Sequence, residues 1–205
     1  MGSGGSSRTL IIAGSALALD IDFTNNVVQK VSLAFPESSD IVTRHTEKAG
    51  AILLRDLQIK PTESPLTKML DQFAANLERL ALPDKLSVIP GLNCYEAIAG
   101  VYESLERLHK WELERLKENG DYNGKADDYV ERAAMCTRSG RPLMHARNRL
   151  GLSLDYWEEK RRISKKSSQQ VGKTYAILIG CAPIPLGLYE TPLSLRVSKD
   201  WISPT

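Results

Sequence analysis

Residues 16–36, ALALDIDFTNNVVQKVSLAFP, decide the class of fold. From Ala16 to Phe23, apolar side chains alternate with small or acidic ones, which is the period of a strand with one buried face. Thr24-Asn25-Asn26 tolerates a tight turn. The alternation then resumes at Val31, Leu33 and Phe35. This stretch therefore predicts an antiparallel hairpin.

Helical spacing follows the hairpin. A first helix is predicted around Ala49 to Leu57, and it ends before Pro61. A second helix is predicted from about Pro65, because a proline at the first helical position loses no hydrogen bond and Ser64 can cap it. Its apolar positions are predicted to form one buried stripe: Leu66, Met69, Leu70, Phe73, Leu77 and Leu80.

Two prolines, Pro83 and Pro90, bracket a predicted connector. The longest predicted helix follows, from about Leu92 to Lys117. A short helix is expected from Asp127 to Cys136, and then a turn from Ser139 to Pro142.

The period of two returns near the end of the chain. Strands are predicted at 150–156, 173–181 and 193–197. Strands that flank a helical middle favour an α+β fold, with a mainly antiparallel sheet from both ends of the chain packed against a central helical region with one long helix. Residues 1–7 read as an expression scar or linker, and 8–205 as a single domain that is a fragment of a longer protein.

Composition excludes several function classes. The net charge of +2 creates no overall field toward nucleic acid or an anionic membrane, and no apolar run approaches the length of a membrane span. Three cysteines at wide spacing suggest neither a disulfide framework nor a zinc site. We expect no cofactor and no metal.

The motifs that could carry catalysis are incomplete. Gly172-Lys173-Thr174 resembles the end of a phosphate-binding loop, but Ser167 stands where that loop needs a glycine. Ser153 lies in an alternating strand and is predicted to be a surface serine. Asp20 and Asp22 lie on the same side of a strand and could form a carboxylate pair. A solvated sheet face would carry the same residues, and we favour that interpretation because no third acidic or histidine ligand lies at short spacing.

The three histidines are too scattered to suggest a metal site: His45, His109 and His145. His109 differs in lying within the apolar arc of the longest predicted helix, with Glu112 about one turn later. A structural pair between His109 and Glu112 is favoured over a role for His109 as a general base.

Several segments together resemble the conserved region of the fungal Mediator subunit one family. They are TLIIAGSALALDIDF (9–23), KVSLAFPES (30–38), the stretch 70–117 with DQFAANLERL, DKLSVIPGLNCYEA and SLERLHKW, and CTRSGRPLMHARNRLGLSLDYWEEKR (136–161). No single segment is a chemical motif, so their joint order carries the resemblance, which weakens after Arg162.

The resemblance implies a non-catalytic subunit of the Mediator coactivator in the nucleus, where it relays activator signals to RNA polymerase II. Its implied partners are other middle-module subunits, and transcriptional activators through regions outside this fragment. Animal relatives bind nuclear receptors through LxxLL helices. Leu53-Leu54-Arg55-Asp56-Leu57 has the wrong spacing for that motif, so receptor binding is not carried over.

Three classes of function stay open. The first is a scaffold or interaction domain, and the second is an enzyme with an unrecognised active site between sheet and helices. The third is a nucleic-acid-binding module, supported only by the basic run of Lys160, Arg161, Arg162, Lys165 and Lys166. This run also fits a solvated loop or a nuclear-import signal. Ser164 follows two arginines and is a candidate phosphorylation site.

The longest predicted helix has a second, narrow face without charges, formed by Ala97, Gly100, Ser104 and Trp111. A glycine inside a helix costs about 1 kcal/mol relative to alanine, so close packing of another backbone would explain Gly100. Either the domain's own elements fill this face, or a helix of a neighbouring subunit docks there. We expect Trp111 to be partly exposed in the isolated chain and to anchor such a partner.

Overall fold

The chain begins with an antiparallel meander of three strands in the order β1-β2-β3. The computed structural model describes residues 6–59, 64–89, 91–118, 120–122, 124–159 and 173–183. The strands are β1 (Ser7–Ala13), β2 (Ala18–Thr24) and β3 (Val27–Ala34). Asn25 and Asn26 both have positive φ, as a two-residue hairpin turn requires. The predicted hairpin is confirmed, whereas β1 was not predicted, and Ser7 is its first residue.

Among the described residues, five α-helices and one short 3-10 helix follow the meander. The α-helices are α1 (Asp40–Thr43), α2 (Thr46–Leu57), α3 (Asp71–Leu86), α4 (Cys94–Glu118) and α5 (Asp127–Thr137), with η1 (Gly120–Tyr122) before α5. α2, α4 and α5 lie where the sequence places helices. With 25 residues, α4 is the longest of the described helices.

The predicted start of α3 is wrong. The helix begins at Asp71, and the residues near Pro65 form a separate turn in which Thr67 N donates to Ser64 O. Leu66 is 97% exposed. A helix is stabilised mainly by the surface it packs on, and in α3 only Phe73, Leu77 and Leu80 meet the core. The connector prediction is also wrong at one end, since Pro83 lies inside α3.

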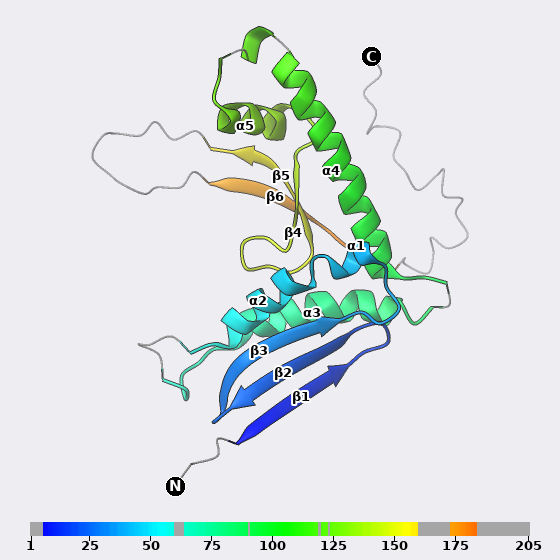
Figure 1. Ribbon diagram of the computed structural model, residues 1–205, viewed down its shortest axis with the longest axis vertical. Coiled ribbons are helices and arrows are strands. Elements are labelled where there is room, and N and C mark those ends of the chain that lie inside the picture. The colour runs from blue at the N-terminus through cyan, green and yellow to red at the C-terminus, as the bar shows by residue number, and fades with distance from the viewer. Residues whose placement is uncertain are drawn as a thin grey trace.

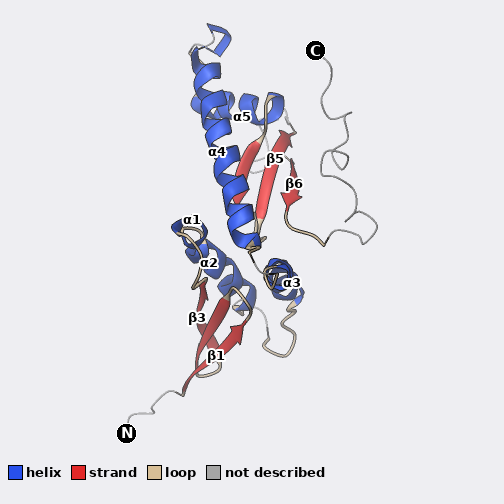
Figure 2. Ribbon diagram, turned by 90° about the vertical axis from the view of Figure 1, so that its right-hand side faces the viewer, coloured by secondary structure: helices blue, strands red, loops and turns tan. Residues whose placement is uncertain are grey.

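A second antiparallel sheet, in the order β4-β5-β6, stands apart from the first. Its strands are β4 (Arg141–Met144), β5 (Leu152–Glu158) and β6 (Thr174–Ile179). The α+β class is therefore confirmed, but the two ends of the chain form two sheets, separated by helices (Figures 1 and 2). The turn predicted to include Arg141 and Pro142 is corrected, since both lie in β4. The strand predicted at 193–197 lies outside the described residues.

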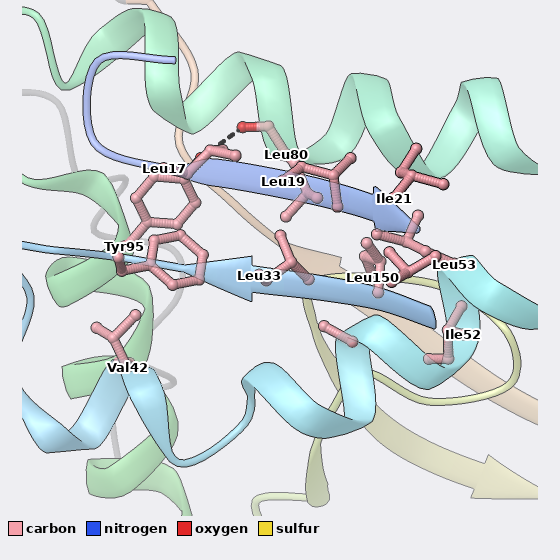
Figure 3. Packing of buried hydrophobic residues seen from close by; sticks show 14 residues of the cluster. Leu17, Leu19, Ile21, Leu33, Val42, Ile52, Leu53, Leu80, Tyr95 and Leu150 are labelled. Carbon is pink, nitrogen blue, oxygen red and sulfur yellow. Dashed lines mark hydrogen bonds between the residues drawn. The ribbon is translucent and has the colours of Figure 1, made fainter. Parts of the chain in front are cut away.

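The main hydrophobic core lies between the first sheet and the helices above it (Figure 3). The sheet contributes alternate residues of two strands, Leu19 and Ile21 from β2 and Val31 and Leu33 from β3. α2, α3 and the start of α4 close the core from the other side (Figures 1 and 3). Leu150, from the loop between β4 and β5, also enters this core and connects it to the second sheet.

α2 lies so close to β3 that its glycine is required. A Cβ atom at Gly50 would lie 2.6 Å from the carbonyl oxygen of Val31, which is backbone in a paired strand. Gly50→Ala should therefore destabilise the chain by about 1–3 kcal/mol, as overpacking does. Urea unfolding measures this change.

Gly100 provides the matched control for that measurement. It also lies in a helix, but a Cβ atom added at Gly100 would have nothing within 4 Å of it. Gly100→Ala should stabilise the chain by about 1 kcal/mol through helix propensity. Equal effects of the two substitutions would contradict the close contact between α2 and β3.

Candidate functional site

One face of α4 is open to solvent along most of the helix. Ala97, Gly100, Ser104 and Trp111 are all exposed, and Trp111 is 54% exposed. The expected exposure of Trp111 is confirmed, and no described helix or strand fills this face. Val101, next to these residues on the helix surface, is 43% exposed and extends the open face.

The exposed positions on α4 follow the spacing of a coiled-coil seam. Ala97, Val101, Ser104, Leu108 and Trp111 are separated by four, three, four and three residues. This is the spacing of the a and d positions that pack against a second helix. Ser104 Oγ donates to Gly100 O at 2.8 Å, so its hydroxyl is satisfied within α4 and leaves the seam weakly polar.

The other faces of α4 contact the rest of the chain, and its buried residues are Cys94, Tyr95, Ala99, His109 and Leu116. At its N-terminal end Glu96 accepts a hydrogen bond from Ser39 Oγ at 2.7 Å, and Tyr95 Oη donates to Leu80 O at 2.7 Å. Further along, Glu112 accepts from Ser139 Oγ at 2.6 Å. These contacts attach α4 to the rest of the chain, while the seam residues are exposed.

A buried amide, Asn76, joins α3 to the loop between β4 and β5. Its Nδ2 donates to Asp56 Oδ2 (2.7 Å) and to Asn148 O (2.9 Å). Its Oδ1 accepts from Leu150 N (3.0 Å) and from the Arg79 guanidinium (3.2 Å). Asn76 is fully buried, and all four of its hydrogen-bonding positions are used.

The same loop, residues 145–151, holds His145 in one tautomer. Gly151 N donates to His145 Nδ1 at 3.1 Å, so the ring proton lies on Nε2. Burial, and then the positive charges of His45 and Lys48, lower the pKa of His145 to about 4. His145 is therefore neutral at physiological pH.

His45 and His145 border a small cavity between α2, α3, α4 and this loop. The cavity has a volume of about 60 Å³, and its walls are mainly apolar. The two imidazole rings are 6.4 Å apart between centroids, and burial lowers the pKa of His45 as well. At that separation the rings pack against each other without sharing a proton.

A buried ion pair in the second sheet was not predicted from the sequence. Asp155 is fully buried, accepts a hydrogen bond from Arg147 Nη1 at 2.8 Å and is also bonded by Arg141 at 3.3 Å. Two arginines on one carboxylate leave a net positive charge beside the loop. The only signal in the sequence is an acidic residue inside an alternating strand with arginines nearby.

The residues considered for catalysis have structural partners. Ser153 is buried, which corrects the predicted surface position, and its Oγ donates to Leu143 O at 3.3 Å. Asp22 accepts from Thr9 Oγ1 at 2.7 Å, while Asp20 is half-buried on the same side of β2. Among the described residues, no histidine, lysine or carboxylate is hydrogen-bonded to Ser153 Oγ, and none is bonded to Asp20 or Asp22 as a catalytic partner would be.

The predicted pair of His109 and Glu112 is wrong, because Glu112 binds Ser139 instead. His109 is buried, and its Nδ1 has no hydrogen-bond partner among the described residues. Burial lowers the pKa of His109, and the negative charge of Glu112 opposes that effect. A neutral imidazole packed between α4 and β4 fits these observations.

Part of the predicted site lies outside the described residues. This applies to the basic run Lys160, Arg161, Arg162, Lys165 and Lys166, to Ser164 and to Gly172. In the part of the chain that the structure describes, no three side chains of His, Cys, Asp or Glu gather as a metal ion would require. Nor is any described helix long and apolar enough to cross a membrane.

These features define an α+β protein with an exposed, seam-like helix face. Comparison with protein families gives a match over residues 1–205 to the model for Mediator of RNA polymerase II transcription subunit 1. The chain therefore belongs to the family of Mediator subunit 1, a component of the coactivator complex that regulates transcription. Among curated proteins, none matches the chain.

The hydrogen bonds of Asn76 predict a large loss of stability when its amide is removed. Asn76→Leu keeps the branched shape of the side chain but removes the amide that bonds Leu150 N, Asn148 O and Asp56. We expect a loss of about 3 kcal/mol or more in urea unfolding. Gln72 is the control, because its Nε2 also donates to Asn148 O but from the surface. Gln72→Leu should change stability by less than about 0.5 kcal/mol, and equal losses would contradict the role of Asn76.

The lowered pKa of His145 predicts that the fold weakens in acid. Between its ordinary pKa of 6.5 and its folded value of about 4, the unfolded chain binds a proton that the folded chain does not. Stability is therefore complete above pH 6.5 and falls toward pH 4, by at most about 3 kcal/mol from this group. Urea unfolding at pH 7 and pH 5 measures the loss.

His145→Asn separates this effect from other acid effects. Asparagine tolerates the positive φ of 53° at this position and can accept the bond from Gly151 N. The variant should lose less stability than the original chain between pH 7 and pH 5. An unchanged loss would show that His145 does not cause it.

Proposed function

We propose that this chain is a non-catalytic interaction subunit, held in the Mediator middle module by a helix of a neighbouring subunit that packs on the exposed seam of α4. It thereby helps to relay activator signals to RNA polymerase II in the nucleus. Activators themselves contact regions outside these residues. The exposed seam of α4, in a chain of the Mediator subunit 1 family, is the observation that carries the proposal.

The seam fits a helix better than an extended peptide. Its spacing of four and three residues repeats over Ala97 to Trp111, which is four turns of α4. The absence of a side chain at Gly100 allows a partner backbone to approach closely, and the space at that position is open. Near the other end, the Arg115 guanidinium lies 5.5 Å from the centroid of the Trp111 ring and supports the anchor.

Charges of both signs border the seam. Arg107 is exposed and precedes Leu108 by one position. Glu114 is exposed and follows Trp111 by three positions. Charges beside a helical seam select the partner and its register more than they add affinity. The proposed partner helix therefore carries an apolar stripe with a complementary acidic and basic residue at its edge. No observation on the described residues favours the enzyme hypothesis, so we propose no second function.

Trp111→Ala tests the proposal. Truncating a central tryptophan typically costs an interface about 2 kcal/mol or more, so the recovery of middle-module subunits with the tagged chain should fall about tenfold or more. The melting temperature of the isolated chain should change little, because Trp111 is largely outside the core. Quantitative mass spectrometry of the purified complex measures the recovery.

Trp157→Ala is the matched control, since Trp157 is 51% exposed but lies on β5. It should leave the recovery of Mediator subunits unchanged. Equal recovery with both variants would contradict docking on α4. Unfolding of the Trp111→Ala chain would place Trp111 in the internal core and would also contradict it.

A further inference from the structure

A groove with basic walls runs between α2 and the loop that follows β4. It has a volume of about 480 Å³. α2 provides one wall and residues 143–148 provide the other, and Figure 1 shows this loop lying beside α2. Lys48 Nζ donates to Met144 O at 2.8 Å, which fixes the two walls relative to each other. None of this surface belongs to the seam on α4.

The wall on α2 is built as a charged pair with an apolar centre. Lys48, Ala51, Ile52 and Arg55 line the groove and follow the spacing of one helix face. Lys48 and Arg55 are seven residues apart, which is about 10 Å along a helix at 1.5 Å per residue. Because Lys48 Nζ is held at Met144 O, Lys48 and Arg55 offer two cationic positions along the groove.

The positive charge of the groove is not neutralised by its neighbours. Arg55 is exposed and has no ion pair or hydrogen bond with any described residue. Lys48 uses one donor on a carbonyl, which leaves its charge unpaired. Arg147 shares Asp155 with Arg141, so that cluster also carries one excess positive charge. Among the described residues, no acidic side chain lines the groove.

The opposite wall offers backbone donors as well. The amide N–H groups of Ala146, Arg147 and Asn148 donate to no other described residue. Arg147 and Asn148 have positive φ, so this wall is a tight turn of the loop. The groove therefore combines two separated cations, apolar contacts and free amide donors.

We propose that this groove binds an acidic peptide segment of a partner protein, with two carboxylates about 10 Å apart and an apolar side chain between them. The carboxylates pair with Lys48 and Arg55, and the apolar side chain packs on Ala51 and Leu143. Single-stranded nucleic acid fits less well, because no described aromatic side chain other than His145 lines the groove to stack on a base. This binding is additional to, and independent of, the docking proposed on α4.

Fluorescence anisotropy with the complete chain tests the proposal. The probe is a short labelled peptide of glutamate and leucine whose carboxylates are spaced to span Lys48 and Arg55. The peptide should bind saturably, and its affinity should fall with salt. Arg55→Glu should weaken binding about tenfold or more, since it replaces attraction by repulsion.

Arg138→Glu makes the same change of charge at an exposed arginine that lies just after α5 and lines no part of the groove. It should change affinity less than about twofold, and Trp111→Ala should leave binding unchanged even if docking on α4 fails. The proposal is overturned if the peptide does not bind, or if the two arginine variants weaken it equally. It is also overturned if the same peptide with glutamine in place of glutamate binds as tightly. A third contradicting result is that single-stranded DNA displaces the probe and that Arg55→Glu weakens DNA binding more than peptide binding.

Discussion

The arrangement of the two sheets depends on the burial of one amide. Asn76 projects from α3 and satisfies groups from α2, from α3 and from the loop between β4 and β5. A buried amide with unpaired donors or acceptors costs as much as several lost contacts, so this set of bonds forms completely or the loop lies elsewhere. Leu150, whose amide is bonded to Asn76, enters the main core as a result. The polar junction and the apolar core thus specify the same position for the second sheet.

Both proposed binding surfaces follow from that junction. The loop fixed by Asn76 supplies one wall of the basic groove, and Lys48 crosses to the carbonyl of Met144 at its edge. α4 runs from the first core along the second sheet and is bonded to both parts, through Tyr95 at one end and Glu112 toward the other. One side of α4 is buried by this packing. On the other side, Ala97, Gly100, Ser104 and Trp111 are exposed, and no described element covers them.

Elements with a strong local pattern were predicted from the sequence, and elements that depend on distant partners were not. The hairpin was predictable because alternation and the Asn25-Asn26 turn agree with each other. β1 lacks alternation, and its strand conformation comes from pairing with β2. α3 begins at Asp71 and not near Pro65, where the capping signals placed it, because the early turn has no surface to pack on.

The candidate surfaces show the same difference between local patterns and distant contacts. The open face of α4 was predictable, since a glycine and small residues at helical spacing are a local pattern. The groove, the Asn76 bonds and the burial of Asp155 were not, because each requires residues well separated in the chain to meet. A polar residue in an apolar pattern, such as Asn76 in α3, shows only that a partner is needed and does not identify it.

Site-specific photo-crosslinking in assembled Mediator tests whether a neighbouring subunit packs on the seam of α4. A photoreactive residue is placed at Leu108, inside the seam of α4, and a second at Tyr129, which is exposed on α5. We expect the probe at position 108 to crosslink to a helical segment of a neighbouring middle-module subunit, and the probe at position 129 not to reach that segment. An assembled complex in which position 108 crosslinks to no other subunit would contradict docking on the seam of α4.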